Sequence, residues 1–181
     1  MLIQADCSCL LIIDIQEKLL PHVQDHDALV KHTAWLMQIA SELKVPMLVS
    51  EQYPRGLGPT VEALRDLAPA DVFMDKIHFS CVDAPECLPR LAETKREQFV
   101  LTGIEAHVCV LQTALGLIRK GHEVFVVADA ISSRGADDVT FALARMRQEG
   151  VRIVSREMVA FEWLHKSGTP EFKDISRRFL R

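Results

Sequence analysis

Short apolar segments recur along the whole chain, and each is followed by a segment with helical periodicity. The first, CLLIIDIQ at residues 9–16, is almost continuously apolar, as is typical of a strand buried on both faces of a parallel sheet. Residues 27–44 then place apolar side chains at helical spacing, with Asp27 as the expected N-cap. The pattern predicts a three-layer, Rossmann-like α/β fold, in which helices cover both faces of a mostly parallel six-stranded sheet.

The same alternation continues to the C-terminus and predicts one domain over residues 1–181. The other strands are expected at 46–50, 71–80, 97–104, 122–133 and 151–155. The other helices are expected at 62–67, 85–95, 106–121, 137–150 and, with a break at 167–170, 156–181. In such a sheet, ligands bind beyond the carboxyl ends of the strands, where the strand order reverses.

The composition narrows the class of partner. A formal net charge of −4 and a pI near 6.0 give no basic face for nucleic acid. No apolar run reaches the roughly 18 residues of a membrane span, and no secretory signal is recognisable. The chain has five cysteines, an odd number that favours free thiols in a reducing compartment. We expect a cytoplasmic protein that acts on a small molecule and binds neither nucleic acid nor membranes.

Three chemically distinct residues follow three of the expected strands. Asp14 ends the first strand, Lys76 leaves the third, and Cys109 lies just past the fourth, so all three are expected at one edge of the sheet. Taken singly, each has a simpler explanation as a loop carboxylate, a solvated lysine or a core thiol. Taken together, they have a chemical meaning. The helix that begins near Cys109 offers unpaired N–H groups, Lys76 offers a positive charge and Asp14 offers a base, and all three favour a reactive thiolate at neutral pH.

The motifs around these residues resemble the isochorismatase-like cysteine hydrolases, which include nicotinamidases and N-carbamoylsarcosine amidohydrolase. The matching segments are LLIIDIQEKLL, DKIHFS and LTGIEAHVCVLQTALGLIRKGHEVFVVADAISS, and the resemblance covers residues 9–160. It implies an Asp14–Lys76–Cys109 triad that hydrolyses an amide through a thioester. It also implies a cis peptide between Ile104 and Glu105, and an oxyanion hole formed by the N–H groups of Glu105 and Cys109.

Differences from the family pattern limit the chemistry further. Nicotinamidases carry an Asp and His pair of metal ligands after the second strand, where this chain has SEQYPRGLGPT, so neither a metal nor another cofactor is expected. Members that hydrolyse isochorismate lack the cysteine, so Cys109 argues against that reaction. The EQYPRGLGPT segment resembles a subgroup of mostly unassigned hydrolases, one branch of which forms compact oligomers.

Several further residues are predicted to line the substrate pocket. They are Gln16, Glu51, Gln52, Tyr53, Phe79 and His107. Two other functions remain open: a thiol-redox protein that pairs Cys109 with Cys81, and a non-catalytic binding or scaffold member of the fold. The apolar helix at 107–118 and the apolar tail around MVAFEWL leave surface to cover, which predicts a homo-oligomer.

Overall fold

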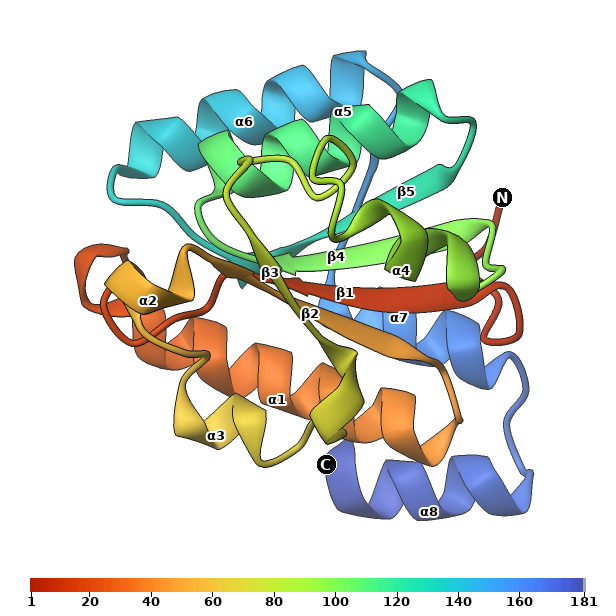
Figure 1. The fold of residues 1–181 in the computed structure, drawn as a ribbon. Helices are drawn as coiled ribbons and strands as arrows, with labels where there is room; N and C mark the ends of the chain where they lie inside the picture. Colours follow the sequence, from red (N-terminus) through yellow and green to blue (C-terminus); the bar gives the residue numbers. More distant parts are fainter. Residues whose placement is uncertain (181) are drawn as a thin grey trace.

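The computed structural model describes residues 1–180 and contains one parallel sheet. Its six strands lie in the order β3-β2-β1-β4-β5-β6 (Figure 1). All adjacent strands pair in parallel. The strands are β1 (Ser8–Ile13), β2 (Met47–Gln52), β3 (Phe73–Lys76), β4 (Gln98–Gly103), β5 (Glu123–Ile131) and β6 (Arg152–Val154). The predicted fold class is therefore confirmed, and the sheet is entirely parallel.

Helices cover both faces of the sheet, as Figure 1 shows. On one face lie α1, α3, α7 and α8, and on the other α4, α5 and α6. The helices are α1 (His26–Glu42), α2 (Pro54–Leu57), α3 (Glu62–Arg65), α4 (Leu88–Glu93), α5 (Leu111–Arg119), α6 (Ala136–Gln148), α7 (Arg156–Leu164) and α8 (Pro170–Phe179). Short helical turns are η1 (Leu20–His22), η2 (Ala70–Val72) and η3 (Ala106–Val110). No helix within residues 1–180 has the length and apolar character needed to cross a bilayer.

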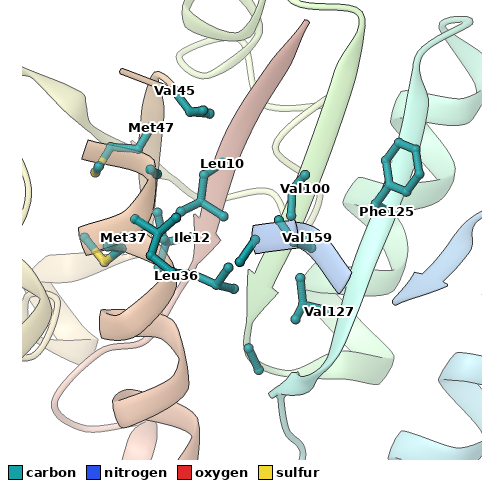
Figure 2. Close-up of a cluster of buried hydrophobic side chains, with 14 of the residues drawn as sticks. Leu10, Ile12, Leu36, Met37, Val45, Met47, Val100, Phe125, Val127 and Val159 are labelled. Carbon is teal, nitrogen blue, oxygen red and sulfur yellow. The ribbon is translucent and has the colours of Figure 1, made fainter. Parts of the chain in front are cut away.

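The two layers of helices divide the hydrophobic core into two clusters. Successive side chains of β1 point to opposite faces of the sheet and so belong to different clusters. Leu10 and Ile12 pack toward α1 and α7, whereas Leu11 and Ile13 pack toward α4, α5 and α6. Figure 2 shows the first cluster, in which Leu10 and Ile12 meet Leu36 of α1. Because both faces of the central strands are buried, these strands are continuously apolar in the sequence.

The centre of the sheet allows a close approach between β1 and β4. Gly103 ends β4 at a φ of +124°, and a Cβ atom there would lie 2.1 Å from the carbonyl oxygen of Ile13. Only glycine is compatible with both the backbone conformation and the contact. Since β2 and β3 lie on one side of β1, and β5 and β6 lie beyond β4, the strand order reverses between β1 and β4, where the predicted cleft is expected.

The helix predicted at 106–121 is the main local difference from the sequence-based expectation. It begins with one π-helical turn, η3, in which the N–H of Val110 donates to the carbonyl of Glu105 over 3.2 Å, and it continues as α5. The cap predicted for α1 is wrong: Asp25, in a left-handed conformation, precedes the helix, and Asp27 lies in its first turn. The strand expected at 71–80 is shorter, because the chain turns away from the sheet after Lys76.

Candidate active site

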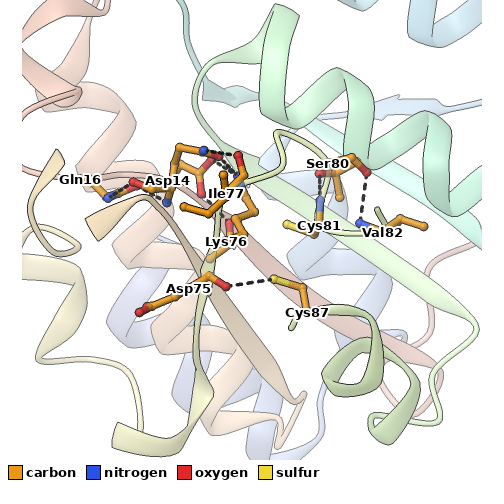
Figure 3. Close-up of polar contacts among 12 residues, drawn as sticks. Asp14, Gln16, Asp75, Lys76, Ile77, Ser80, Cys81, Val82 and Cys87 are labelled. Atoms are coloured by element: carbon orange, nitrogen blue, oxygen red, sulfur yellow. Dashed lines mark hydrogen bonds and ion pairs between the residues drawn. The ribbon is translucent and has the colours of Figure 1, made fainter. Parts of the chain in front are cut away.

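A buried ion pair lies at the carboxyl ends of β1 and β3. The Nζ atom of Lys76 is 2.7 Å from Oδ2 of Asp14, and neither side chain is exposed to solvent. Ser50, on β2, donates a hydrogen bond of 2.7 Å to the other carboxylate oxygen, Oδ1. Asp14 itself has a left-handed backbone, with a φ of 53°, which non-glycine residues rarely adopt. Figure 3 shows Asp14 and Lys76 meeting between the strand ends.

Lys76 has a second buried acceptor besides Asp14. Its ammonium donates a hydrogen bond of 2.7 Å to Oε1 of Gln52, the last residue of β2. Burial is the largest single effect and lowers the pKa of Lys76, but the negative charge and hydrogen bond of Asp14 together with the nearby Cys109 and Cys81 outweigh it, so the pKa lies above its ordinary value. The lysine is therefore a buried cation throughout the neutral pH range.

Cys109 lies beside this ion pair, in the π-helical turn that follows β4. Only 6% of the residue is accessible to solvent. Burial raises the pKa of the Cys109 thiol, the charge of Asp14 raises it further, and Lys76 partly opposes both effects. The direction of this pKa shift is opposite to the one expected from the sequence, because desolvation and Asp14 together outweigh the lysine.

The segment between β4 and Cys109 contains an available backbone donor. The peptide bond between Ile104 and Glu105 is cis. Within residues 1–180 the N–H of Glu105 donates no hydrogen bond, whereas its carbonyl accepts from Val108 and Val110. The Glu105 carboxylate is held to one side by Arg134, whose Nε lies 2.8 Å from Oε2. The N–H group thus remains free to bind a ligand oxygen.

Three of the residues predicted to contact substrate are occupied within the protein. Nε2 of Gln16 donates to the carbonyls of Gln52 and Gly58 over 3.0 and 2.7 Å. Oε1 of Glu51 accepts hydrogen bonds of 2.6 Å from both the N–H and the hydroxyl of Thr60. Gln52 bonds Lys76, as described above. These side chains organise the edge of the sheet and the loop that leaves it.

The other three predicted residues are more exposed than these. Tyr53 and Phe79 are about half exposed, at 51% and 53%. His107 points toward α6, with Nδ1 2.9 Å from the hydroxyl of Ser133 and Nε2 4.0 Å from Asp138.

A cavity of about 230 Å³ lies beside the end of β3, and neither Asp14 nor Cys109 is among its lining residues. Its lining includes Lys76, and Tyr53, Arg55, Ile77 and Glu86 contribute to its walls. The volume is below the range of drug-sized ligand pockets and suits a small molecule.

Sequence reasoning missed Ser50 as a neighbour of the ion pair, and it missed the hydrogen bond between Cys81 and Cys87. The sequence pattern predicts Ser50 only as the last residue of a strand, although a hydroxyl in a buried strand needs a buried hydrogen-bond partner and indicates that one is present. Cys81 is fully buried, and its pKa is lowered by a hydrogen bond from Cys87, an effect that burial opposes. Nothing in the local sequence could have indicated that pairing. Within residues 1–180, no group of three or more His, Cys, Asp or Glu side chains could hold a metal ion.

Known proteins resemble this chain over almost its whole length. A family model described as the isochorismatase domain matches residues 8–158. Isochorismatase family protein 1B of Dictyostelium discoideum is 35% identical over 176 residues, which cover 94% of this chain and 84% of the relative. The secreted isochorismatase effector Isc1 of Phytophthora sojae is 39% identical over 176 residues, with coverages of 94% and 83%. The structure of MAR1 ribonuclease from Caenorhabditis elegans, 35% identical, gives a TM-score of 0.92 and covers 100% of this chain and 93% of that one.

Proposed function

The chain belongs to the isochorismatase family, and we propose that it is a cysteine hydrolase that cleaves a C–N bond in a small amide-type substrate. The observation that carries the proposal is the buried Asp14–Lys76 ion pair beside Cys109. A desolvated ion pair gives little net stability compared with apolar packing, so its presence here is better explained by chemistry.

The raised pKa of Cys109 is compatible with nucleophilic attack, because Asp14 can accept the thiol proton as the reaction proceeds. Before the transfer, Asp14 carries the negative charge and the thiol is neutral; afterwards the carboxyl is neutral and the sulfur carries the charge. Lys76 is positive in both states and balances whichever group is ionised. The transfer therefore leaves the net charge of the buried group unchanged.

The reaction then has two halves. In acylation, the sulfur of Cys109 attacks the amide carbonyl carbon, a C–S bond forms, the C–N bond breaks, and the proton on Asp14 moves to the departing amine nitrogen. In deacylation, Asp14 takes a proton from water, whose oxygen attacks the thioester. The C–S bond breaks, the acid leaves, and the proton on Asp14 returns to the sulfur.

An oxyanion forms in both halves and needs donors. We propose that the N–H groups of Glu105 and Cys109 bind it. The free donor at Glu105 supports this role. One such donor is worth about 3 to 4 kcal/mol in other hydrolases, a factor of about 100 to 1000 in rate.

A small amide is preferred over RNA, although the Caenorhabditis elegans relative is described as a ribonuclease. This chain has a formal net charge of −4, and the cavity that adjoins Lys76 measures about 230 Å³. The negative net charge would repel a polyanionic substrate, and a cavity of this volume is too small to admit one.

The wider setting is also proposed. We propose one domain over residues 1–181 in a reducing, cytoplasmic compartment, which the five free cysteines support. We further propose a homo-oligomer, because large apolar side chains remain exposed within residues 1–180. The exposed side chains are Met1, Leu2, Tyr53, Ile77, Phe79, Phe141, Met158 and Phe161.

The test is a screen of small primary amides and ureido compounds, read out as ammonia release and as an acyl adduct by intact mass. Hydrolysis by the wild type, lost in Cys109→Ala and retained in Cys7→Ala, is the expected result. Cys7 is a matched control because it is more exposed and precedes β1, at the opposite edge of the sheet.

Two outcomes of the screen would overturn the proposal. Cleavage of a short RNA, unaffected by Cys109→Ala, would support ribonuclease activity. A Cys81–Cys109 disulfide formed by peroxide, without amide turnover, would support the thiol-redox alternative.

A further inference from the structure

The Lys76 ammonium is held from two sides by groups of different charge. It donates to a carboxylate oxygen of Asp14 and to the amide oxygen of Gln52, each over 2.7 Å. An ammonium has three donors, so one N–H remains after these two bonds. The two acceptors together fix the direction of the third N–H.

The orientation of the Gln52 amide is itself fixed. Its Nε2 donates a hydrogen bond of 2.7 Å to the carbonyl of Ile77, so its oxygen must face Lys76. The backbone of Gln52 is also clamped by Gln16, whose Oε1 accepts from its N–H over 2.7 Å and whose Nε2 donates to its carbonyl over 3.0 Å. Gln16 is fully buried, which shields this clamp from water. Figure 3 shows Gln16 and Ile77 close to Asp14 and Lys76.

We propose that Gln52 is a positioning residue that holds Lys76 toward Cys109 without adding charge. This inference rests on the proposed function, in which Lys76 balances a single negative charge shared by Asp14 and Cys109. A glutamate at position 52 could accept the same hydrogen bond but would add a second negative charge beside the lysine. The thiolate would then be disfavoured, so the site requires an acceptor that is both fixed and neutral.

Two substitutions separate the two requirements. Both variants lose the bond from Nε2 to the carbonyl of Ile77. Gln52→Met also removes the acceptor for Lys76, whereas Gln52→Glu keeps an acceptor and adds a negative charge. The readout is the rate at which iodoacetamide alkylates Cys109 at about pH 8, and peptide mass mapping identifies the modified cysteine. The rate is proportional to the fraction of Cys109 present as thiolate, which falls about tenfold for each unit by which the thiol pKa rises. Urea unfolding of each variant establishes that it is folded under the assay conditions.

The matched control is Gln98, another buried glutamine, at the start of β4 and the opposite edge of the sheet. Its amide bonds the N–H of Gln4 and the carboxylate of Glu123 over 2.7 and 2.9 Å. Gln98→Met and Gln98→Glu should reduce stability and leave the alkylation rate of Cys109 unchanged.

The expected ranking is specific. Gln52→Glu should slow alkylation of Cys109 by about 10-fold or more, and Gln52→Met should slow it by less. A purely structural role predicts the reverse order, since glutamate preserves the bond to Lys76. Rates equal to the wild type in both variants, or a faster rate in Gln52→Glu than in Gln52→Met, would overturn the inference. Alkylation needs no substrate, so the two proposals can fail separately. A wild type that hydrolyses no amide would refute the proposed function, and the order of the alkylation rates in the Gln52 variants would still test the role of Gln52.

Discussion

Separating the buried ion pair should be far more damaging than removing it. Lys76→Met leaves the Asp14 carboxylate in a fully buried position without a cation, and Asp14→Asn leaves the ammonium with only neutral amide oxygens, that of Gln52 and that of the introduced side chain. In Asp14→Asn/Lys76→Met, neither charge remains. A thermodynamic cycle of these three variants measures how strongly the two side chains depend on each other.

The magnitude follows from the separation and the burial. Two unit charges 2.7 Å apart attract by about 6 kcal/mol at an effective dielectric constant of about 20. Desolvation offsets much of this attraction, and removal of one partner of a buried pair costs about 3 to 5 kcal/mol in other proteins. Each single variant should therefore lose a large part of a typical stability of about 5 to 15 kcal/mol. The double variant should be more stable than either single one.

Urea unfolding at neutral pH, followed by tryptophan fluorescence, measures the free energies, with the dependence on urea checked for two-state behaviour. A suitable control is Glu42→Gln, which breaks an ion pair of the same 2.7 Å length between Glu42 and Arg178, with both side chains at least 40% exposed. This variant should change stability far less, because solvent screens the pair. If each single variant costs less than about 1 kcal/mol, or if the double variant costs the sum of the two, the pair is not desolvated and the reasoning fails.

Three further predictions concern single positions. Asp14→Asn should speed alkylation of Cys109 at about pH 8 while abolishing hydrolysis, since the charge of Asp14 helps to raise the thiol pKa; slower alkylation would contradict this account. Gly103→Ala should cost about 3 kcal/mol or more in urea unfolding, because the new Cβ would meet the Ile13 carbonyl at 2.1 Å and φ is +124°, and wild-type stability would disprove the contact. Burial raises the pKa of Cys9 from 9.0 to about 12, so its neutral thiol stabilises the fold below about pH 9 and this contribution is lost as the pH rises toward 12. Between about pH 9 and 12, the unfolding free energy of Cys9→Ala should therefore fall less steeply with pH than that of the wild type, by about 1.4 kcal/mol per pH unit. Equal slopes in the two proteins would refute the raised pKa of Cys9.

Much of the fold could be predicted from the chain because its strands are buried on both faces. A continuous apolar run such as the one at residues 9–16 is stable only between two layers of helices, so the layer architecture follows from local composition. The ends of elements were less predictable. The π-helical turn at Ala106–Val110 departs from an α-helix in the backbone bonds from Val110 to Glu105 and from Leu111 to Ala106, each of which spans five residues, and no side-chain pattern encodes that choice.

The sequence by itself determined which reactive groups lie at one edge of the sheet, because Asp14, Lys76 and Cys109 each follow a strand and parallel strands end together. Only the tertiary structure decided their electrostatic state. The burial of the thiol, the pairing of Lys76 with Asp14 and the neutral acceptor at Gln52 arise from residues far apart in the chain. The pKa of a buried group depends on desolvation and on charges within a few ångströms, and these are properties of packing that residue spacing does not contain.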